Sequence, residues 1–510
     1  MIVSKATPEA TAQYCSKFQE LLHKKLPKQN LNISASGFGS YRVDYRVREH
    51  FDSLEYAILN GINLIDTSSN YSDGGSEILI GNVLKKLIET GKIKREEIVV
   101  VTKGGYIQGR IYEMAQRKKE RGEPFKEVVE YASGLWHSIH PEFLSMQISQ
   151  SLERMQLETI DVYLLHNPEY FLDSSLKDEL SADELIHEYY RRIKEAFNYL
   201  ESEVDKGRIE SYGISSNSFV LNNGEQTFTS LEMCINCACE IKKDNHFYTV
   251  EFPINLYERG ALLNRNQKNG TATVLELANE SGLDVLANRP LNAMKEKKLT
   301  RLADFETNSD YYNLDETQII AEISLLDSME ESFLKEYIDV LNLSQQNKDA
   351  VSYFLKAGQL LKENWKNFDS IENFNDVKKQ FLIPRVNYAF STMISSPDLT
   401  NEMKNKLDAI ARQTNKLMSI IETVYGLMAN TRSRKLHDKL NSLVIGNEVD
   451  SFKDLSLSQK SLLLLNSIDE ISCTLVGMRQ KKYVDDVLGS LKAKKIENVK
   501  MLLEKLEISS

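Results

Sequence analysis

Residues 62–81 read INLIDTSSNYSDGGSEILIG. The stretch opens with an apolar run that ends in Asp66 and continues through a loop rich in Ser, Asn, Asp and Gly. From Gly75 onward the apolar residues follow helical spacing. The stretch is therefore one β-then-α unit, and repetition of such units along a chain predicts parallel strands with covering helices.

The unit recurs along the chain. The expected strands are Asn32–Phe38, Ile62–Asp66, Ile98–Lys103, Ile160–His166, Ile209–Ser215, Phe247–Phe252, Leu283–Ala287 and Ser472–Gly477. The expected helices are Arg48–Asn60, Gly75–Glu89, Pro141–Met155, Glu184–Lys206, Leu231–Lys242, Thr273–Ser281, Lys482–Leu491 and a tail helix over Asn498–Leu506. Eight strands alternating with helices predict an α/β fold, the closed (β/α)8 or TIM barrel.

The connection between the seventh and eighth strands is far longer than an ordinary βα connection. Its apolar residues show helical spacing over Phe333–Val340, Lys348–Lys362, Asp376–Leu382 and Glu402–Met428. We interpret it as an all-helical insertion, because the eighth strand follows it. The expected organisation is an N-terminal segment (1–31), a first barrel part (32–294), the helical insertion (295–470), and a second barrel part with the C-terminal helix (471–510).

The seventh strand ends at the barrel face that carries active sites. We therefore expect residues 295–465 to pack beside the barrel mouth as a lid. The alternative is an outward-facing appendage that serves oligomer contacts.

The composition excludes several classes of function. The 510 residues include 63 Lys+Arg and 74 Asp+Glu, for a formal charge of −11. This acidity argues against nucleic-acid binding. No apolar run approaches the roughly 20 residues that cross a bilayer, and the N-terminus lacks the pattern of a secretory signal. Five cysteines provide no disulfide framework. We expect a cytoplasmic protein without nucleic-acid or membrane partners.

Three of the cysteines crowd into CINCACE (234–240). A zinc site needs a fourth ligand, for which His246 is a weak candidate. Helical spacing places Cys234 and Cys237 on one face, which favours buried thiols. We therefore predict no metal site.

Polar residues end the second, third and fourth strands: Asp66, Lys103 and His166, with Tyr71 in the loop after Asp66. Strand ends of a barrel meet at one face. A nearby ammonium stabilises a phenolate, a carboxylate holds the ammonium charged, and an imidazole can polarise a carbonyl. Each residue alone also fits a turn, a salt bridge or a core position. Together they predict proton transfer to a carbonyl or from an alcohol, with hydride supplied by a nicotinamide cofactor.

The chain resembles the aldo-keto reductases over about residues 32–292 and 472–492. The matching segments are GFGSYR (37–42), IDTSSNYSDGGSEILIG (65–81), VVVTKGG (99–105), SLERMQLETIDVYLLHNPE (151–169), KGRIESYGISSN (206–217) and, more loosely, LVGMRQKKYVDDVL (475–488). The resemblance implies an NADP-dependent oxidoreductase with Tyr71 as general acid/base. It further implies that Lys103 and Asp66 tune Tyr71, and that His166 positions the substrate carbonyl.

The resemblance also implies cofactor contacts. Ser215, Ser216 and Asn217 fall where the family contacts the nicotinamide carboxamide, and either serine can be the aligned one. Glu251 falls where many members have Gln.

The phosphate end of the cofactor involves later residues. Arg289 and Leu291, in NRPLNA (288–293), follow the seventh strand, where the family's backbone holds the pyrophosphate. Gly477 permits close backbone approach to a helix N-terminus that suits an anion. Arg479 suits the adenosine 2′-phosphate, which favours NADPH over NADH.

Two alternative hypotheses about the function remain open. The first is a nucleotide-binding regulatory or scaffold protein on the same barrel, with the insertion serving a partner. The second is a hydrolase, which would need metal-ligating groups or paired carboxylates at strand ends. The leading reading is a carbonyl reductase or alcohol dehydrogenase that acts on a small molecule.

Overall fold

The computed structural model describes residues 1–174, 180–295, 298–305, 307–368, 370–444 and 449–507. By its internal contacts the chain divides into two units. The barrel unit comprises Met1–Ala293 and Leu440–Ser510, and the helical unit comprises Met294–Lys439. Each unit has a hydrophobic core of its own.

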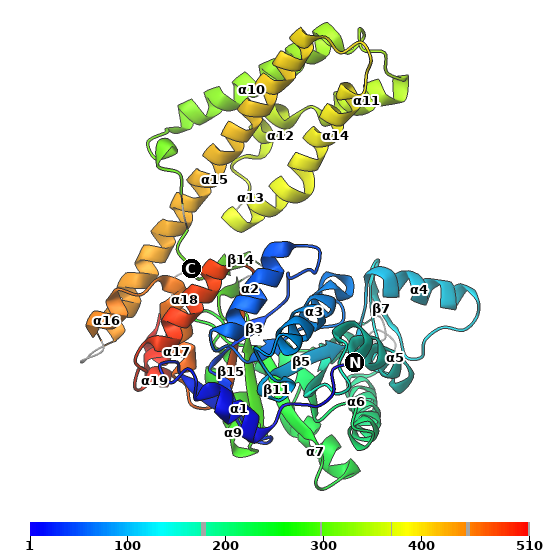
Figure 1. Cartoon of the computed structure of the whole chain (residues 1–510), viewed down its shortest axis with the longest axis vertical. Coiled ribbons are helices and arrows are strands. Elements are labelled where there is room, and N and C mark those ends of the chain that lie inside the picture. Colours follow the sequence, from blue (N-terminus) through cyan, green and yellow to red (C-terminus); the bar gives the residue numbers. More distant parts are fainter. Residues whose placement is uncertain (175–179, 296–297, 306, 369, 445–448, 508–510) are drawn as a thin grey trace. The chain divides into compact units, whose positions relative to one another are not determined.

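Eight parallel strands close into a barrel (Figure 1). In order around it they are β3 (Ser36–Gly39), β4 (Leu64–Asp66), β5 (Val99–Gly104), β9 (Val162–His166), β10 (Tyr212–Ser215), β11 (Phe247–Pro253), β12 (Asp284–Asn288) and β15 (Cys473–Gly477). β15 pairs with both β12 and β3, which closes the sheet. The predicted TIM barrel is confirmed, and its last strand follows the helical insertion.

Helices follow the strands as the periodicity predicts. They are α2 (Arg48–Leu59), α3 (Gly75–Glu89), α5 (Pro141–Met155), α6 (Ala182–Asp205), α7 (Leu231–Ile241), α9 (Val274–Glu280), α18 (Lys481–Lys492) and the tail helix α19 (Val499–Lys505). Local chemistry explains several starts. Ser181 and Thr273 form capping boxes with the residue three positions into the helix, and Pro141 occupies the first turn of α5.

The first expected strand has the wrong bounds, because Asn32–Phe38 is two strands. β2 (Leu31–Ser34) pairs antiparallel with β1 (His23–Leu26), and β3 begins only at Ser36. Apolar residues of this hairpin join the core formed by inward-facing barrel residues. The hairpin precedes β3, so it fills the end of the barrel at which the strands begin. A continuous apolar run cannot reveal such a break.

The helical unit starts with a short ribbon, so the insertion is not entirely helical: β13 (Asn292–Lys295) and β14 (Lys298–Arg301) pair in a two-stranded sheet. The helices that follow are α10 (Glu316–Tyr337), α11 (Gln345–Phe354), α12 (Ala357–Asn364), α13 (Ile371–Val377), α14 (Ile383–Ile394) and α15 (Asn401–Leu443). Ion pairs from Glu322 to Lys416 and from Glu336 to Lys406 show that α10 and α15 run antiparallel (Figure 1). None of the helices in the described ranges is both long and apolar enough to span a membrane.

Two helix predictions within the insertion need correction. Lys348–Lys362 is two helices, because Lys356 leaves the helical conformation and the Glu330 carboxylate accepts hydrogen bonds from the backbone N–H groups of Ala357 and Gly358, at 3.2 and 2.8 Å. Asp376–Leu382 is part of a longer run from α13 into α14, which Pro384 does not interrupt because it lies in the first turn of α14.

The barrel unit resumes at Leu440, earlier than the expected boundary at 471. The helix α17 (Leu457–Asn466) accounts for the difference, because it packs on α18. At its start, the hydroxyls of Ser456 and Ser458 donate hydrogen bonds to the Asp486 carboxylate of α18. A short helix, α16 (Val449–Lys453), precedes it.

Candidate active site

The structure brings the four predicted catalytic residues together at the carboxyl end of the barrel. Asp66 ends β4, Lys103 lies one residue before the end of β5, and His166 ends β9. These three strands are neighbours in the barrel. Tyr71 opens the short 3-10 helix η1 (Tyr71–Gly74), directly after β4. All four positions follow from strand order and from the short loop after Asp66.

Lys103 is the buried centre of the cluster. Its Nζ forms an ion pair with Asp66, lies 3.2 Å from Glu251 Oε2, and donates to the backbone carbonyl oxygen of Thr67 at 3.2 Å. Burial by itself lowers the pKa of Lys103, but the charges of Asp66 and Glu251 outweigh burial and raise it. The ammonium is therefore charged at physiological pH.

Tyr71 lies against this ammonium. Lys103 Nζ is 5.5 Å from the centroid of the Tyr71 ring. The ring also packs edge-on against His166, at 6.0 Å between centroids, and against Tyr41, at 5.2 Å. Burial raises the pKa of Tyr71, and the positive charge of Lys103 opposes that rise. The hydroxyl is thus held as a protonated donor beside a cation.

The loop that carries Tyr71 is fixed in an unusual conformation. Ser72 and Asp73 have φ of 51° and 55°, and Gly74 has φ of 84°. A side chain at Gly74 would meet Arg154 Cδ at 2.8 Å, so both the dihedral angle and the close approach favour glycine. Arg154 is held in turn by Glu77, through a 2.6 Å hydrogen bond from Nε to Oε2.

His166 is buried and neutral. Burial, followed by the charge of Lys103, lowers its pKa well below the ordinary value. The hydroxyl oxygen of Ser68 lies 3.0 Å from His166 Nδ1 and 2.7 Å from Asn70 Oδ1. A hydroxyl has one hydrogen. The structure directs this hydrogen to Asn70 Oδ1, an oxygen that can only accept. If the hydroxyl turns to donate to Nδ1 instead, the imidazole hydrogen lies on Nε2, where it can be donated to a substrate.

Aromatic side chains that the sequence did not single out surround His166. The Tyr106 ring lies 4.6 Å from the His166 ring between centroids, and the Tyr170 hydroxyl is 3.4 Å from that of Tyr106. His137 Nε2–H donates to the backbone oxygen of His166 at 2.7 Å. Tyr106 follows Lys103 by three residues, and that proximity is the one signal by which the sequence could have indicated it.

Tyr106 and His137 belong to a small antiparallel sheet in the enlarged connection after β5. It contains β6 (Tyr106–Ile107), β8 (Leu135–His137) and β7 (Val129–Ala132), in the order β6-β8-β7, and the helix α4 (Gly109–Glu120) lies between β6 and β7 in the chain. Strands of two to four residues are too short to show periodicity.

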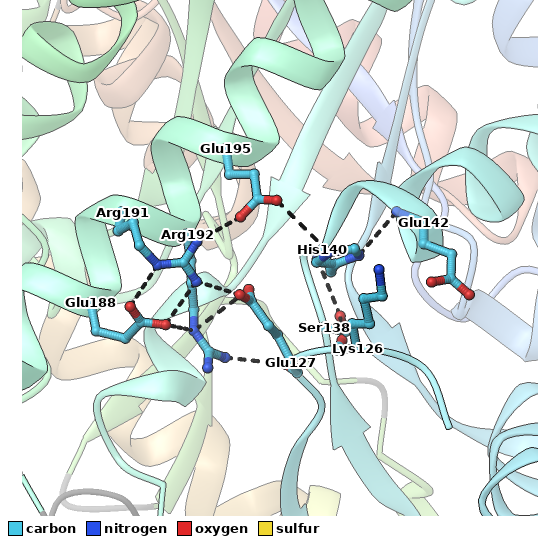
Figure 2. Close-up of polar contacts among 9 residues, drawn as sticks. All are labelled: Lys126, Glu127, Ser138, His140, Glu142, Glu188, Arg191, Arg192 and Glu195. Atoms are coloured by element: carbon cyan, nitrogen blue, oxygen red, sulfur yellow. Dashed lines mark hydrogen bonds and ion pairs between the residues drawn. The ribbon is translucent and has the colours of Figure 1, made fainter. Parts of the chain in front are cut away.

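A charged network ties this sheet to helix α6 (Figure 2). Arg191 forms ion pairs with Glu127, just before β7, and with Glu188 and Glu195 on its own helix. Arg192 Nη1 donates to the Glu127 carbonyl oxygen at 3.2 Å. Single exposed pairs contribute little, but this set fixes the segment that leads to His137.

The expected nicotinamide positions adjoin the cluster. Ser215 lies in register with both His166 and Glu251 on the neighbouring strands. The Ser216 hydroxyl is 2.9 Å from that of Ser218, and the Asn217 backbone N–H donates to Glu169 at 3.0 Å. Burial raises the pKa of the Glu169 carboxyl to about 7.

Glu251 accepts a hydrogen bond on one oxygen and forms an ion pair through the other. Oε2 faces Lys103, and Oε1 accepts a hydrogen bond from Asn288 Nδ2 at 2.9 Å. The other side-chain atom of Asn288, Oδ1, is buried and has no hydrogen-bond partner within the described part of the chain. Arg289, the next residue, donates to Glu258 at 2.7 Å, and Leu291 lies in the turn before β13.

The part of the cofactor site that is expected to bind the phosphates lies where β15 meets α18. Gly477 ends β15, and a side chain there would meet no atom of the structure within 4 Å. Gln480, at the N-cap of α18, makes no side-chain capping bond. Arg479 lies near His50, whose pKa is lowered by burial and by the Arg479 charge. A hollow at this end is lined by Glu49, Asp52, Gln480, Lys481 and Lys482. The open glycine, the uncapped helix start and the unpartnered Asn288 Oδ1 fit a nicotinamide dinucleotide.

The three cysteines of residues 234–240 were also considered as metal ligands. Cys234 and Cys237 are buried in α7, and His246 Nδ1 pairs with Glu201 at 2.9 Å. Within the described ranges, no group of three or more His, Cys, Asp or Glu side chains could hold a metal ion.

Comparison with known proteins identifies the class. The sequence model of the Aldo/keto reductase family matches residues 36–323. The chain belongs to this family of oxidoreductases, and its barrel carries the helical insertion before the last strand.

Individual relatives are more distant. The NADH-specific methylglyoxal reductase of Escherichia coli (strain K12) is 30% identical over 153 residues, which are 28% of this chain and 41% of that protein. The chain thus spans less than half the length of this curated relative. An aldo-keto reductase from Bacillus halodurans in its holo form matches with 16% identity and a TM-score of 0.44, over 95% of this chain and 96% of that one. An aldo/keto reductase from Klebsiella pneumoniae, in complex with NADP and acetate, matches with 18% identity and a TM-score of 0.33, over 52% and 68%.

Proposed function

We propose that the protein transfers hydride between NADPH and the carbonyl or alcohol group of a small molecule, as a carbonyl reductase or alcohol dehydrogenase. The observation that carries this proposal is the buried Lys103 ammonium, paired with Asp66 and lying 5.5 Å from the ring of Tyr71. This arrangement suits a phenol that gives and recovers a proton. The predicted location of the protein remains the cytoplasm.

In the reductive direction, Tyr71 donates its hydroxyl proton to the carbonyl oxygen. Lys103 stabilises the phenolate that remains, and solvent returns the proton. His166 Nε2–H, in the tautomer that a Ser68 donor would select, hydrogen-bonds the same oxygen and stabilises charge developing there. The cofactor, when bound, supplies the hydride. In the oxidative direction, the tyrosinate accepts the alcohol proton.

The cofactor would lie across the carboxyl ends of the later strands. The residues proposed to hold it are Ser215, Ser216, Asn217, Glu251, Arg289, Leu291, Gly477 and Arg479. The amide of Asn288 can serve the same region, because its buried Oδ1 lacks a partner in the described part of the chain. Arg479 favours NADPH, whereas the Escherichia coli relative is named as NADH-specific, so both cofactors belong in the assay.

The test is turnover with a panel of activated carbonyls, beginning with methylglyoxal because of that relative's name. We expect Tyr71→Phe to lower kcat by about 10²–10⁴-fold while NADPH still binds. Tyr41→Phe is the matched control: it removes an exposed hydroxyl next to Tyr71 and should keep kcat within a few-fold. If Tyr71→Phe kept more than about a tenth of wild-type kcat, Tyr71 would not be the acid. Cofactor binding without turnover of any carbonyl would favour the scaffold alternative.

A further inference from the structure

Lys103 faces two carboxylates rather than one. Asp66 reaches it from β4, and Glu251 reaches it from β11, on another side of the barrel. All three side chains are buried, with Lys103 at 0%, Asp66 at 5% and Glu251 at 3% exposure. With both carboxylates ionised, the cluster carries a net charge of −1 before Tyr71 titrates.

Two of the three ammonium hydrogens are directed to protein oxygens. A lysine has three N–H donors. One is directed to Asp66 and one to the Thr67 carbonyl, and Glu251 Oε2 lies 3.2 Å from the same nitrogen. Tyr71 meets Lys103 across its ring face, at 5.5 Å, and ionisation of Tyr71 would bring a further negative charge into a buried site.

We propose that Glu251 is a positioning residue that acts through Lys103: its carboxylate holds the ammonium and keeps the Tyr71 hydroxyl protonated, so that proton donation to a carbonyl is favoured at neutral and alkaline pH. This inference rests on the proposed role of Tyr71 as the acid. It gives Glu251 a function within the proton-transfer cluster itself, separate from any contact with a cofactor.

The surroundings of Tyr71 support this role. Burial raises its pKa, Lys103 lowers it, and the charges of Asp66 and Glu251 raise it again. The other groups that act on it are Tyr41, in the loop after β3, His166, on β9, and Tyr106, on β6. His166 and Tyr106 are uncharged near neutral pH, because burial lowers the pKa of His166 and raises that of Tyr106. Of the two carboxylates, Glu251 can be neutralised while Asp66 still keeps Lys103 charged.

The test measures Tyr71 directly, in the protein without added cofactor. Tyrosine labelled with ¹³C at Cζ is titrated by NMR, and the Tyr71 resonance is identified by its loss in Tyr71→Phe. Glu251→Gln keeps the shape of the side chain and an oxygen for Asn288. We expect the Tyr71 pKa to fall by about one unit or more in this variant, whereas Glu251→Asp, which keeps the charge, should stay closer to wild type.

Activity provides the second readout. In Glu251→Gln the alkaline limb of the reductive pH profile should move to lower pH by the same shift, and the ratio of oxidative to reductive rate at pH 7 should rise. Glu203→Gln is the matched control, because it removes a buried carboxylate of α6 that pairs with Lys206 and Arg208, just after that helix. It should leave the Tyr71 titration where it was.

The two hypotheses fail separately. An unchanged Tyr71 titration in Glu251→Gln would overturn the role of Glu251, whatever the activity. A shifted titration in a protein that turns over no carbonyl would support the electrostatic coupling and overturn the proposed reaction. If Glu251→Gln were too unstable to titrate, Glu251→Met, which also removes the charge, would decide: a lowered Tyr71 pKa would support the proposal, and an unchanged one would overturn it.

Discussion

Replacement of Lys103 by Met should destabilise the barrel unit in a pH-dependent way. Lys103→Met removes the cation from two buried carboxylates, Asp66 and Glu251, while it leaves an apolar side chain of similar length. Breaking a buried ion pair by removing one partner costs about 3–5 kcal/mol, because the remaining charge is left uncompensated. We expect a loss of this size at neutral pH.

The sign of the pH dependence follows from the carboxyl groups. Burial already raises the pKa of Asp66, Lys103 opposes that rise, and Glu251 adds to it. Without Lys103 the folded pKa rises further above its unfolded value of about 4. Such a group binds its proton more tightly when folded, so stability is fullest below about pH 4 and is lost as pH rises through the folded pKa. The variant should therefore approach wild type at low pH and diverge from it toward alkaline pH.

Urea unfolding followed by tryptophan fluorescence can measure this. The two tryptophans lie in different units, Trp136 in the barrel unit and Trp365 in the helical unit. A Trp365→Phe background therefore reports the barrel alone. Lys103→Met combined with Asp66→Asn and Glu251→Gln, which leaves no unpaired charge, should recover most of the loss. A Lys103→Met variant with a loss below about 1 kcal/mol that does not change with pH would refute the reasoning, because unpaired buried charges cost more than that.

Two other predictions address the cofactor and the insertion. Arg479→Ala should weaken NADPH binding by about 1.5–3 kcal/mol, the value of one charge-assisted contact, and leave NADH nearly unchanged; titration calorimetry with both cofactors measures this, and equal weakening would show that Arg479 does not read the 2′-phosphate. If residues 295–465 act as the expected lid, their amides should gain protection in hydrogen exchange when NADP⁺ binds. A gain confined to the barrel loops after Asp66, Lys103, His166 and Ser215 would assign the insertion to the appendage alternative.

Much of the barrel could be predicted from local patterns. The predicted starts of α3 and α5 agree with the structure to the residue. A glycine-containing turn marks the first, and Pro141 marks the second. The placement of Asp66, Tyr71, Lys103 and His166 at one mouth follows from the rule that parallel strands end together. Such features depend on periodicity, turn chemistry and strand order, and a single amino-acid sequence reveals all three.

Other features depend on contacts between distant segments. The hairpin of β1 and β2 separates from β3 because its apolar residues pack into the barrel interior. In the insertion, α11 and α12 separate where Glu330, from another helix, caps the second of them. No local signal distinguishes these breaks from continuous strand or helix, because the stabilising partner lies elsewhere in the chain.

The candidate site shows the same division. By itself the sequence determined which residue types lie at the strand ends, and so the class of chemistry: a phenol, an ammonium, a carboxylate and an imidazole. Only the tertiary structure decided that Glu251 shares Lys103 with Asp66 and that Tyr106 packs on His166. The physical reason is that a pairing of buried charges or rings is set by barrel closure and by loop packing, which join residues far apart in sequence, whereas periodicity reports only which face a residue occupies.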